Sequence, residues 1–444
     1  MTHDHWNDTA AHFHPASAID YLSLPRLREL QLQRLRAIVS LAHDRVPLVR
    51  QRMDARGVKP ADIRELADIS KLPFMEKTDL RDTYPYGLFA VDMSEVVRLH
   101  ASSGTTGKPI VVGYTAEDMQ VWNEVIARAL IMYGLRKGDI LQNSFGYGLF
   151  TGGLGLHGGA ETLGCTVVPV SGGNSERQIM FLKDFGVTAI SCTPSYFIHL
   201  IEEAKKLNID LKTLPLRTGI FGAEPWSEGM RQHIETHTNL RAFDIYGLTE
   251  IIGPGVGAEC PCRAGLHIFE DHFYPEIIDP ETHETLPDGA AGELVFTTLS
   301  KRATPIIRYR TRDLTTIIAE PCACGRTNRR IKRINCRSDD MFIIRGVNVY
   351  PSQIEAALMT VDACTPNYFI TLERAKELDT VLVEVELKPE CFSDSIAAME
   401  NLRREIRDAI ARIVGIRMEI RIVEPGSLAR SQGKAKRVLD KRKI

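Results

Sequence analysis

The sequence lacks the features that direct a chain into or across a membrane. No run approaches the ~20 uninterrupted apolar residues that a membrane-spanning helix needs. The first six residues contain neither a basic segment nor an apolar one, so we expect no secretory signal there. Excess charge is also missing, because 55 Lys and Arg face 57 Asp and Glu and leave a formal net charge of −2. This balance argues against nucleic acid or an anionic membrane as the main partner, and we expect a cytoplasmic protein.

Cysteine is too sparse for a disulfide framework. Nine cysteines stand in 444 residues, which in a cytoplasmic chain indicates free thiols or metal ligands. The length exceeds what one hydrophobic core supports, so we expect two or more domains. A hydrophobic content of 44% and a charged content of 25% are typical of a globular protein. Residues 1–20 are polar and rich in histidine, which predicts a mobile, solvent-exposed terminus.

The strongest local signal is a loop suited to phosphate. Residues 102–109 read Ser-Ser-Gly-Thr-Thr-Gly-Lys-Pro between two short apolar stretches, Val96–Leu99 and Ile110–Val112, which we predict to be strands. Hydroxyls and backbone N–H groups can surround phosphate oxygens, and Lys108 adds a positive charge. The spacing is not that of a Walker A loop, because Ser102 stands in place of the first glycine. We therefore predict a hairpin that closes over a nucleotide; the alternative is a flexible Ser/Gly turn.

Strands and helices alternate after this loop. The pattern predicts helices over 24–43, 116–133, 175–185 and 196–206 and strands over 140–144, 166–170, 189–192 and 218–221. Thr115 and Asp118 are expected to cap the second helix. This rhythm is typical of a parallel sheet covered by helices, in which ligands bind at the carboxyl ends of the strands.

Two motifs stand at such strand ends, Phe221–Trp226 and Ala242–Glu250. Glu250 offers a hard oxygen ligand for Mg²⁺, and Tyr246 offers a flat ring to a purine. Taken singly, each motif could be an ordinary loop. A glycine-rich segment, Phe145–His157, could form the wall of an apolar pocket or a close helix contact, and both interpretations stay open.

Cysteine and histidine cluster in the second half of the chain. Cys260-Pro-Cys262 precedes His267, and Cys322-Ala-Cys324 follows about sixty residues later. Sulfur and nitrogen ligands of this kind fit a closed, tetrahedral structural zinc site. Five candidates compete for four places, and we leave out Cys262. The alternative is a set of reduced loop cysteines.

A β-hairpin region over 288–318 carries further charged residues. Asp313 stands at a predicted strand end, where its two oxygens suit ribose hydroxyls. Arg308, Arg310 and Arg312 suit phosphate, and the alternative is a solvated charge cluster.

The pattern of strands and helices restarts after Asp339–Asp340, where we place a domain boundary. The fold class is therefore α/β, with a large N-terminal domain of parallel and mixed sheets with helices over residues 1–338. A small, mobile α+β domain follows over residues 339–444. Near its end Lys434 follows Gly433 in a basic, loop-like tail, where it could act as a mobile charge or belong to a solvated terminus.

Together these stretches resemble the adenylate-forming superfamily of acyl-CoA synthetases, and more closely the phenylacetate–coenzyme A ligase family. The resemblance covers residues 24–442. It rests on seven motifs in the family's order: 102–109, 147–153, 221–226, 246–250, 309–313, 337–340 and 433–434. It implies ATP, Mg²⁺, coenzyme A and a structural zinc ion as cofactors. It also implies two half-reactions, in which a carboxylic acid is first adenylated and then transferred to the coenzyme A thiol.

The resemblance assigns roles position by position. It places the nucleotide phosphates on Ser102, Ser103, Gly104, Thr105, Thr106, Gly107 and Lys108. It places the adenosine on Gly222, Ala223, Glu224, Pro225, Asp244, Tyr246, Gly247, Asp313 and Arg337. Glu250 is expected to bind Mg²⁺, with Thr249 near the α-phosphate. Lys434 is expected to close on the α-phosphate and the carboxylate in the first half-reaction, with Asp339 as the hinge. The zinc ligands are expected to be Cys260, His267, Cys322 and Cys324.

The expected acyl site departs from the family pattern. Its residues are Phe145, Tyr147, Phe150, Gly158 and Pro254. Phe145 and Gly158 stand where the resemblance leads us to expect tyrosine, and a missing ring at 158 would leave more room if that position lines the pocket. We expect an aryl or arylalkyl acid of the kind met in aromatic acid catabolism, with a bulkier acid such as an indole-bearing one as a candidate.

Two other functions fit part of the pattern. The acceptor could be a carrier-protein thiol, or the enzyme could nucleotidylate a deazaflavin cofactor. The chain could instead be a zinc-stabilised nucleotide-binding regulator without turnover, although Glu250 and Lys434 speak against that. The expected partners are a small carboxylic acid, ATP and coenzyme A, with no nucleic acid and no membrane, and a homodimer is the candidate assembly.

Overall fold

The computed structural model describes residues 13–102, 109–334, 336–338, 341–344, 347–375, 378–393, 395–430 and 437–442. The chain divides into two units, which are treated separately below. The first comprises Met1–Cys192, Leu214–Ala223 and Leu240–Arg333. The second comprises Thr193–Thr213, Glu224–Asn239 and Ile334–Ile444.

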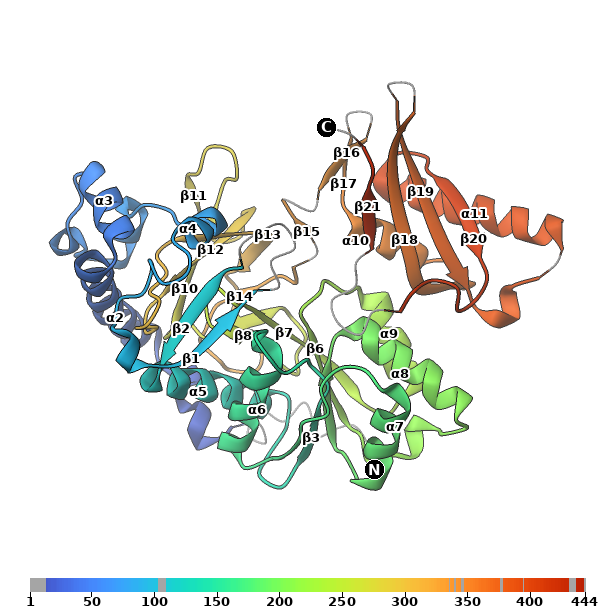
Figure 1. Cartoon of the computed structure of the whole chain (residues 1–444), viewed down its shortest axis with the longest axis horizontal. Coiled ribbons are helices and arrows are strands. Elements are labelled where there is room, and N and C mark those ends of the chain that lie inside the picture. Colours follow the sequence, from blue (N-terminus) through green and yellow to red (C-terminus); the bar gives the residue numbers. More distant parts are fainter. Residues whose placement is uncertain are drawn as a thin grey trace. The chain divides into compact units, whose positions relative to one another are not determined.

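A long mixed sheet forms the centre of the first unit (Figure 1). Its strands follow the order β11-β10-β12-β13-β14-β9-β8-β7-β6-β5-β3-β4. They are β3 (Ile140–Asn143), β4 (Thr166–Val168), β5 (Ala189–Cys192), β6 (Thr218–Gly222), β7 (Arg241–Leu248), β8 (Gly253–Glu259), β9 (Leu266–Ile268), β10 (Phe273–Ile278), β11 (Thr285–Leu286), β12 (Ala291–Thr298), β13 (Tyr309–Ile318) and β14 (Arg330–Ile331). From β7 to β4 the neighbours are parallel, which confirms the predicted sheet. From β7 to β11 they are antiparallel.

The predicted hairpin around the phosphate loop is present. β1 (Val96–Ala101) pairs antiparallel with β2 (Val111–Thr115). The backbone N–H of Ser102 donates to the Ile110 carbonyl at 3.0 Å, so pairing continues to the edge of the loop. Residues 103–108 lie outside the described ranges.

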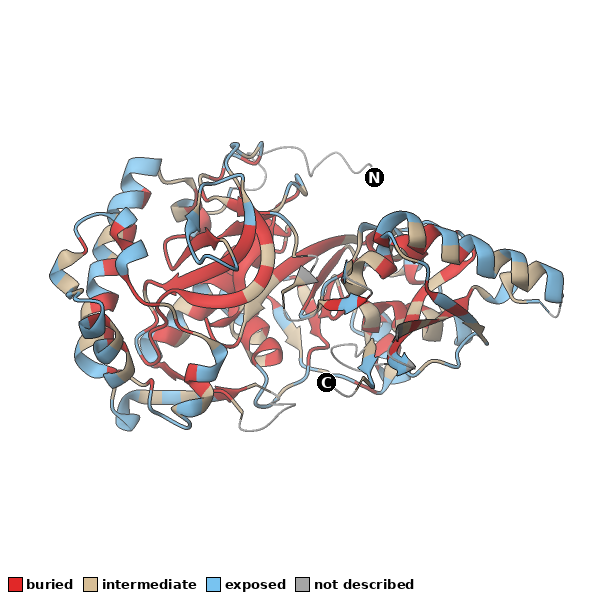
Figure 2. Cartoon of the chain, turned by 90° about the horizontal axis from the view of Figure 1, so that it is seen from above, coloured by how far each residue is buried: buried red, intermediate tan, exposed pale blue. Residues whose placement is uncertain are grey.

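Helices cover this sheet. In the first unit they are α2 (Leu24–Arg45), α3 (Pro47–Ala55), α4 (Lys77–Asp82), α5 (Ala116–Met132), α6 (Thr151–Leu163) and α7 (Ser175–Asp184). Short 3-10 helices span Pro15–Tyr21, Pro60–Asp62, Leu66–Lys71 and Met93–Glu95. The expected cap of α5 is confirmed, because the Asp118 N–H donates to the Thr115 hydroxyl at 3.1 Å and the Thr115 N–H donates to the Asp118 carboxylate at 2.9 Å. Figure 2 shows buried residues running along the strands and striping the helices.

Glycines set the distance between α5 and α6. A Cβ at Gly155 would stand 2.4 Å from the Trp122 ring, and one at Gly159 would stand 2.2 Å from Ile126. Side chains at these positions would push the helices apart, since protein interiors are close-packed. The part of the glycine-rich segment that lies in α6 therefore allows the close contact between α5 and α6.

The mobile terminus predicted for residues 1–20 is wrong for its described end. Pro15–Tyr21 form a 3-10 helix, and Asp20 is fully buried. The Asp20 carboxylate lies 2.5 Å from the guanidinium of Arg128 on α5, which also pairs with Asp271 at 2.9 Å. A buried arginine requires such partners, and no local pattern in residues 1–20 reveals a partner more than 100 residues away.

In its described residues, the second unit combines a sheet, a small hairpin and four α-helices. The sheet has the order β20-β19-β18-β21, and β16 pairs with β17. The strands within the residue ranges of this unit are β15 (Cys336–Arg337), β16 (Phe342–Ile344), β17 (Val347–Val349), β18 (Cys364–Ala375), β19 (Leu378–Leu387), β20 (Glu419–Val423) and β21 (Val438–Asp440). Its helices are α8 (Pro194–Lys206), α9 (Glu228–His237), α10 (Pro351–Leu358) and α11 (Ile396–Val414), with 3-10 turns at Leu211–Thr213 and Pro389–Cys391.

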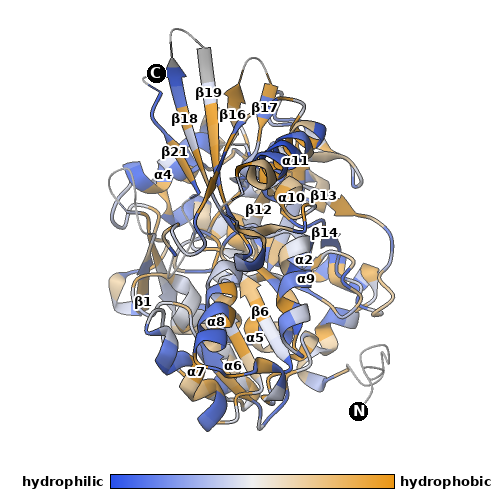
Figure 3. Ribbon diagram, turned by 90° about the vertical axis from the view of Figure 1, so that its right-hand side faces the viewer, coloured by the Kyte–Doolittle hydropathy of each residue, from blue (hydrophilic) through white to orange (hydrophobic). Residues whose placement is uncertain are grey.

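One hydrophobic core holds this unit together. Ile370 and Val383 from the sheet share it with Ile406 and Ile410 of α11, all at 0% exposure. Figure 3 shows both hydrophilic and hydrophobic residues along α11, whose buried residues are Ile406, Ala409, Ile410 and Val414. The arrangement confirms the predicted α+β region. The proposed boundary at Asp339–Asp340 lies outside the described residues and stays a prediction. Within the described ranges, no helix combines the length and apolar character that crossing a bilayer requires.

The first prediction concerns the buried N-terminal ion pair. Replacing Asp20 with Asn should lower the free energy of unfolding by about 3 kcal/mol, because Arg128 loses one of its buried counter-charges. Denaturant unfolding measures the change. The matched control is Glu124→Gln, since Glu124 pairs with the same guanidinium at 3.2 Å but its side chain is 47% exposed. That variant should lose less than about 1 kcal/mol, and equal losses in the two variants would contradict the role of burial.

Candidate functional site

The residues expected to hold adenine and ribose meet in the first unit. Tyr246 lies on β7 and Asp313 on β13, strands that are not neighbours in the sheet. The Tyr246 hydroxyl donates to the Asp313 carboxylate at 2.5 Å, and Asp313 is 6% exposed. Arg312, directly before it, has a φ of +67°, a conformation that L-residues adopt only under constraint and that clusters at functional sites. The structure thus brings together two predicted site residues that are distant in sequence.

Asp244 and Gly247 flank Tyr246 and have structural contacts of their own. The carboxylate of Asp244 lies 3.3 Å from Nε of Arg333, and its carbonyl accepts from the Tyr133 hydroxyl at 2.9 Å. A Cβ at Gly247 would stand 1.9 Å from the Gly253 carbonyl oxygen, so only glycine lets β7 and β8 approach here. Their binding roles stay predictions.

Thr249 and Glu250 occupy the turn between β7 and β8. The Thr249 hydroxyl lies 3.3 Å from that of Thr151, the first residue of α6. Glu250 is 7% exposed, and its Oε1 lies 3.8 Å from Nζ of Lys77. A carboxylate at the carboxyl end of a central strand, with a cation beside it, suits the phosphates and metal of a nucleotide.

Sequence reasoning missed Lys77, the first residue of α4. The chain before it is fixed on β13, because the Met75 N–H donates to the Arg308 carbonyl at 3.2 Å and the Arg310 N–H donates to the Met75 carbonyl at 2.9 Å. This isolated bridge carries Lys77 to Glu250. No local pattern signals it, because the pairing joins segments more than 200 residues apart.

Lys301 was also missed. It is 1% exposed, and its Nζ donates to the Glu250 carbonyl at 3.3 Å. Burial lowers the pKa of Lys301 to about 8, although the nearby Asp118 and Glu250 carboxylates oppose the shift.

The other nucleotide residues are divided between the units. Gly222 ends β6, where a Cβ would meet the Ile245 carbonyl at 2.3 Å, and Ala223 follows with a φ of +69°. Glu224 and Pro225 belong to the second unit, as does Arg337. There the Glu224 carboxylate accepts from the Ser195 N–H at 2.9 Å. Ser103–Lys108, Asp339 and Lys434 lie outside the described residues.

The acyl-site residues show mixed exposure. Phe145 is 6% exposed and Phe150 is 43% exposed. The Tyr147 hydroxyl accepts from the Asn143 amide at 2.9 Å and lies 3.0 Å from Nδ1 of His157; burial raises the pKa of Tyr147 to about 12.

Asn123 of α5 accounts for part of the expected space. A Cβ at Gly158 would stand 2.3 Å from the Asn123 side-chain oxygen, so Asn123 occupies the space directly beside Gly158. Pro254 accepts from the Trp122 indole N–H at 3.0 Å through its carbonyl.

Arg308 and Arg310, near Asp313, are buried in ion pairs, whereas the side chain of Arg312 is 34% exposed. Arg308 pairs with the buried Glu276 at 2.9 Å, and Arg310 pairs with the buried Glu293 at 2.7 Å. Arg312 pairs with Glu76 at 3.0 Å. Burial raises the pKa of Glu276, and the Arg308 charge opposes that shift. These pairs stabilise β13 and its neighbours.

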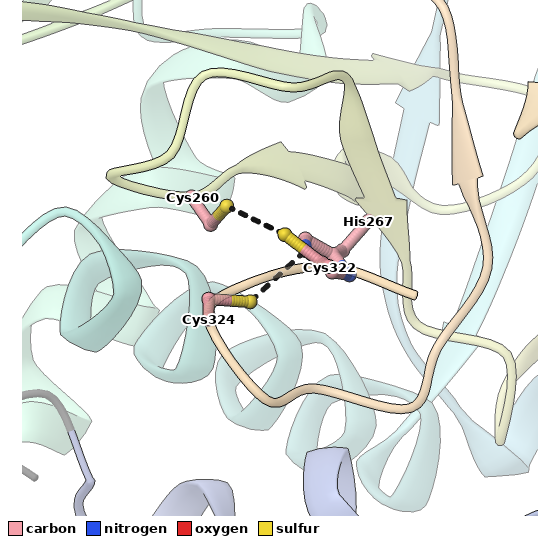
Figure 4. A group of neighbouring side chains, drawn as sticks. All are labelled: Cys260, His267, Cys322 and Cys324. Carbon is pink, nitrogen blue, oxygen red and sulfur yellow. Dashed lines mark hydrogen bonds between the residues drawn. The ribbon is translucent and has the colours of Figure 1, made fainter. Parts of the chain in front are cut away.

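The predicted zinc ligands form one cluster (Figure 4). The ligand atoms of Cys260, His267, Cys322 and Cys324 all lie within 4.8 Å of one another. The Cys260 and Cys322 sulfurs are 3.6 Å apart, and the Cys324 sulfur lies 3.3 Å from Nε2 of His267. Cys262 is exposed and is not part of the cluster, as expected. Nδ1 of His267 lies 3.0 Å from the Asn328 carbonyl, which leaves Nε2 free to point its lone pair at the other ligands.

Comparisons with known proteins show the family of this chain. A family model described as "AMP-binding enzyme" matches residues 16–300, and one described as "AMP-binding enzyme C-terminal domain" matches residues 346–442. The phenylacetate-coenzyme A ligase of Thermus thermophilus is 50% identical over 437 residues, covering 95% of this chain and 98% of that enzyme. The Pseudomonas putida enzyme of the same name is 52% identical, with 95% of each chain covered. The chain belongs to the phenylacetate–coenzyme A ligase family. It is therefore an AMP-forming acid–CoA ligase.

Solved structures agree with the fold of this ligase. A 2-hydroxyisobutyryl-CoA ligase in the postadenylation state, in complex with R3-HIB-AMP, superposes with a TM-score of 0.89 at 29% identity, covering 95% of this chain and 90% of that one. The anthranilate CoA ligase AuaEII, at 17% identity and a TM-score of 0.58, shares the fold over 77% of this chain and 65% of that one.

The second prediction tests Lys77 in this ligase. Lys77→Met should raise the KM for ATP about tenfold in ATP–pyrophosphate exchange, because the variant loses a cation beside the proposed phosphate end of the site. Lys71→Met is the matched control, since Lys71 is an exposed lysine that pairs with Asp68 at 2.7 Å. An unchanged KM in Lys77→Met, or an equal change in both variants, would remove Lys77 from the site.

Proposed function

We propose that this ligase activates an aryl or arylalkyl carboxylic acid with ATP and transfers the acyl group to coenzyme A. A carboxylate oxygen attacks the α-phosphorus, and the bond to pyrophosphate breaks. The coenzyme A thiolate then attacks the acyl carbonyl, a thioester bond forms, and AMP leaves. The observation that carries the proposal is the contact between Tyr246 and Asp313, because it joins the predicted adenine and ribose residues. Glu250 follows the carboxyl end of the strand that carries Tyr246.

The residues near Glu250 supply the electrostatics of the first step. Negative charge grows around the α-phosphorus as pyrophosphate departs, so cations and donors directed there lower the barrier. In this proposal Glu250 holds Mg²⁺, Thr249 donates to the α-phosphate, and the 102–108 loop holds the β- and γ-phosphates. Lys434 acts on the α-phosphate and the acid carboxylate in adenylation. The C-terminal domain, residues 339–444 with its hinge at Asp339, then changes orientation for thioester formation.

The proposed acid class follows the relatives and the acyl-site residues. Relatives of about 50% identity are named phenylacetate-coenzyme A ligases, and the buried Phe145 suits an aromatic acid. The charge balance supports small-molecule partners rather than nucleic acid or membrane. A homodimer and a cytoplasmic location stay predictions.

The third prediction tests the reaction. ATP–pyrophosphate exchange across a panel should give phenylacetate and indole-3-acetate a kcat/KM at least about tenfold above that of hexanoate, since aromatic rings bury more apolar area. AMP release should require free coenzyme A. Lys434→Ala should abolish exchange with every acid.

Three outcomes would contradict the proposal. ATP–pyrophosphate exchange with the fatty acid and with no aromatic acid would show that the proposed substrate class is wrong. AMP release that depends on a carrier protein would replace the acceptor, and nucleotide transfer to a deazaflavin would replace the reaction.

We also propose that the four-ligand cluster binds a structural zinc ion. Around a tetrahedral zinc, with Zn–S near 2.3 Å and Zn–N near 2.0 Å, ligand atoms stand roughly 3.5 Å apart, which fits the 3.6 and 3.3 Å separations seen here. The ion would tie the end of β8 and strand β9 to the Cys322–Cys324 turn. It would supply a crosslink and no reaction step, since four protein ligands close the site.

The fourth prediction tests this metal. Elemental analysis of the purified protein should find close to one zinc per chain. Cys324→Ala should lose the zinc and lower the free energy of unfolding by several kcal/mol, because metal binding is coupled to folding. Cys262→Ala, at the exposed cysteine outside the cluster, should keep the zinc and the wild-type free energy of unfolding. Wild-type protein that contains no zinc, or a Cys324→Ala variant that keeps it, would contradict the proposal.

A further inference from the structure

Three buried side chains donate to alternate carbonyl oxygens of the segment that begins at Glu250. Lys301 Nζ donates to the Glu250 carbonyl at 3.3 Å, the Tyr114 hydroxyl to that of Ile252 at 2.8 Å, and the Trp122 indole N–H to that of Pro254 at 3.0 Å. Tyr114 and Trp122 are 0% exposed. We call these three donors the carbonyl brace. The carbonyls of residues 250, 252 and 254 each accept a hydrogen bond from one member of the brace.

The brace is itself rigid. The Tyr114 and Trp122 rings stack with centroids 4.9 Å apart and planes 15° apart, and Lys301 Nζ stands 4.8 Å from the Tyr114 centroid. A Cβ at Gly253 would meet the Trp122 ring at 2.4 Å, so the ring packs directly on the backbone that it holds. Stacking and the cation–π contact add to the hydrogen bonds and fix the orientation of each donor.

Asp118 anchors the chain next to Lys301. Its carboxylate accepts from the backbone N–H groups of Arg302 at 2.6 Å and Ala303 at 2.9 Å, and it also caps α5. Lys301 is thus attached to the end of the helix that carries Trp122. The long lysine side chain has little freedom left, because the two residues after it are anchored on Asp118 and its Nζ is bonded to the Glu250 carbonyl.

A buried lysine needs a reason, because removing an ammonium from water costs several kcal/mol. An apolar side chain would fill this place more cheaply. This cost has a functional explanation if the ammonium fixes a group whose position matters to catalysis. Its hydrogen bond is to the main chain of Glu250, so it acts on where the Glu250 carboxylate stands and leaves that carboxylate free for other ligands. Displacements of about 1 Å in such groups can cost 10²-fold in rate.

We propose that Lys301 is a positioning residue that fixes the Glu250 carboxylate for the metal, with Tyr114 and Trp122 as its supports. The inference rests on the proposed role of Glu250 as the Mg²⁺ ligand. Tyr114 lies on β2 of the hairpin that carries the phosphate loop, so the brace also fixes Glu250 relative to the base of that hairpin. In this proposal the metal ligand and the base of the phosphate loop keep a fixed position relative to each other.

The fifth prediction tests this role with Lys301→Met, which keeps the apolar length and removes the donor. The Mg²⁺ concentration for half-maximal ATP–pyrophosphate exchange should rise about tenfold. Thioester formation from supplied acyl-adenylate, which consumes no ATP, should stay within about twofold of wild type. Tyr114→Phe, which removes only one hydroxyl, should shift the Mg²⁺ requirement in the same direction by a smaller factor.

The matched control is Gln31→Met. The Gln31 side-chain amide is buried and donates to the Glu270 carbonyl at 3.0 Å, so this variant also loses a donor to a backbone carbonyl. Its Mg²⁺ requirement should equal that of wild type. A Lys301→Met enzyme with the wild-type Mg²⁺ requirement, or one that loses both half-reactions equally, would overturn the inference.

One further variant, Glu250→Gln, separates this inference from the proposed function. If Glu250→Gln keeps the wild-type Mg²⁺ response, the proposed metal ligand is wrong. If Glu250→Gln loses that response and Lys301→Met keeps it, only the positioning role fails. Should Lys301→Met not fold, Tyr114→Phe decides, and an unchanged Mg²⁺ requirement in that variant overturns the inference.

Discussion

The register shift between β7 and β8 is the constraint on which the site depends. Tyr246 pairs with Gly257, but the next residue, Gly247, pairs with Pro254, so β8 holds two extra residues at this point. Such a bulge bends the strands and redirects side chains, which is why bulges occur beside active sites. Here the Tyr246 ring reaches Asp313, while the following turn presents Glu250. Gly255, within the extra pair, has a φ of +94°, a conformation that favours glycine.

The features that were predicted correctly depend on neighbours in sequence. The hairpin of β1 and β2, the capping box of Thr115 and Asp118, and the alternation that builds the parallel strands all follow from patterns a few residues long. The choice of Cys260 over Cys262 agrees with the cluster, in which Cys262 is absent. No local pattern indicates that β7 and β13 approach each other. The prediction that Tyr246 and Asp313 bind the same nucleotide therefore depended on the family resemblance.

The features that were missed depend on contacts between distant segments. The sequence pattern places Asp20 in a polar tail, but the residue pairs with the buried Arg128. The pattern also suits Arg308 and Arg310 to phosphate, with a solvated cluster as the alternative, but both pair with buried carboxylates. A charged residue has the same letter whether it is solvated or paired in the core. Burial and pairing are decided by tertiary structure, and a single sequence contains no direct record of them.

The two lysines beside Glu250 divide one task in a way that their environments explain. Lys77 is 45% exposed and faces the carboxylate, so under the proposed function it can exchange the carboxylate for a phosphate at little cost in desolvation when the metal arrives. Lys301 is buried and bonded to the carbonyl, so it cannot leave without exposing an unsatisfied group. A side chain that must exchange partners needs a main chain that does not move. In the proposed site, the exposed Lys77 allows the Glu250 carboxylate to exchange partners, and the buried Lys301 holds the Glu250 main chain in place.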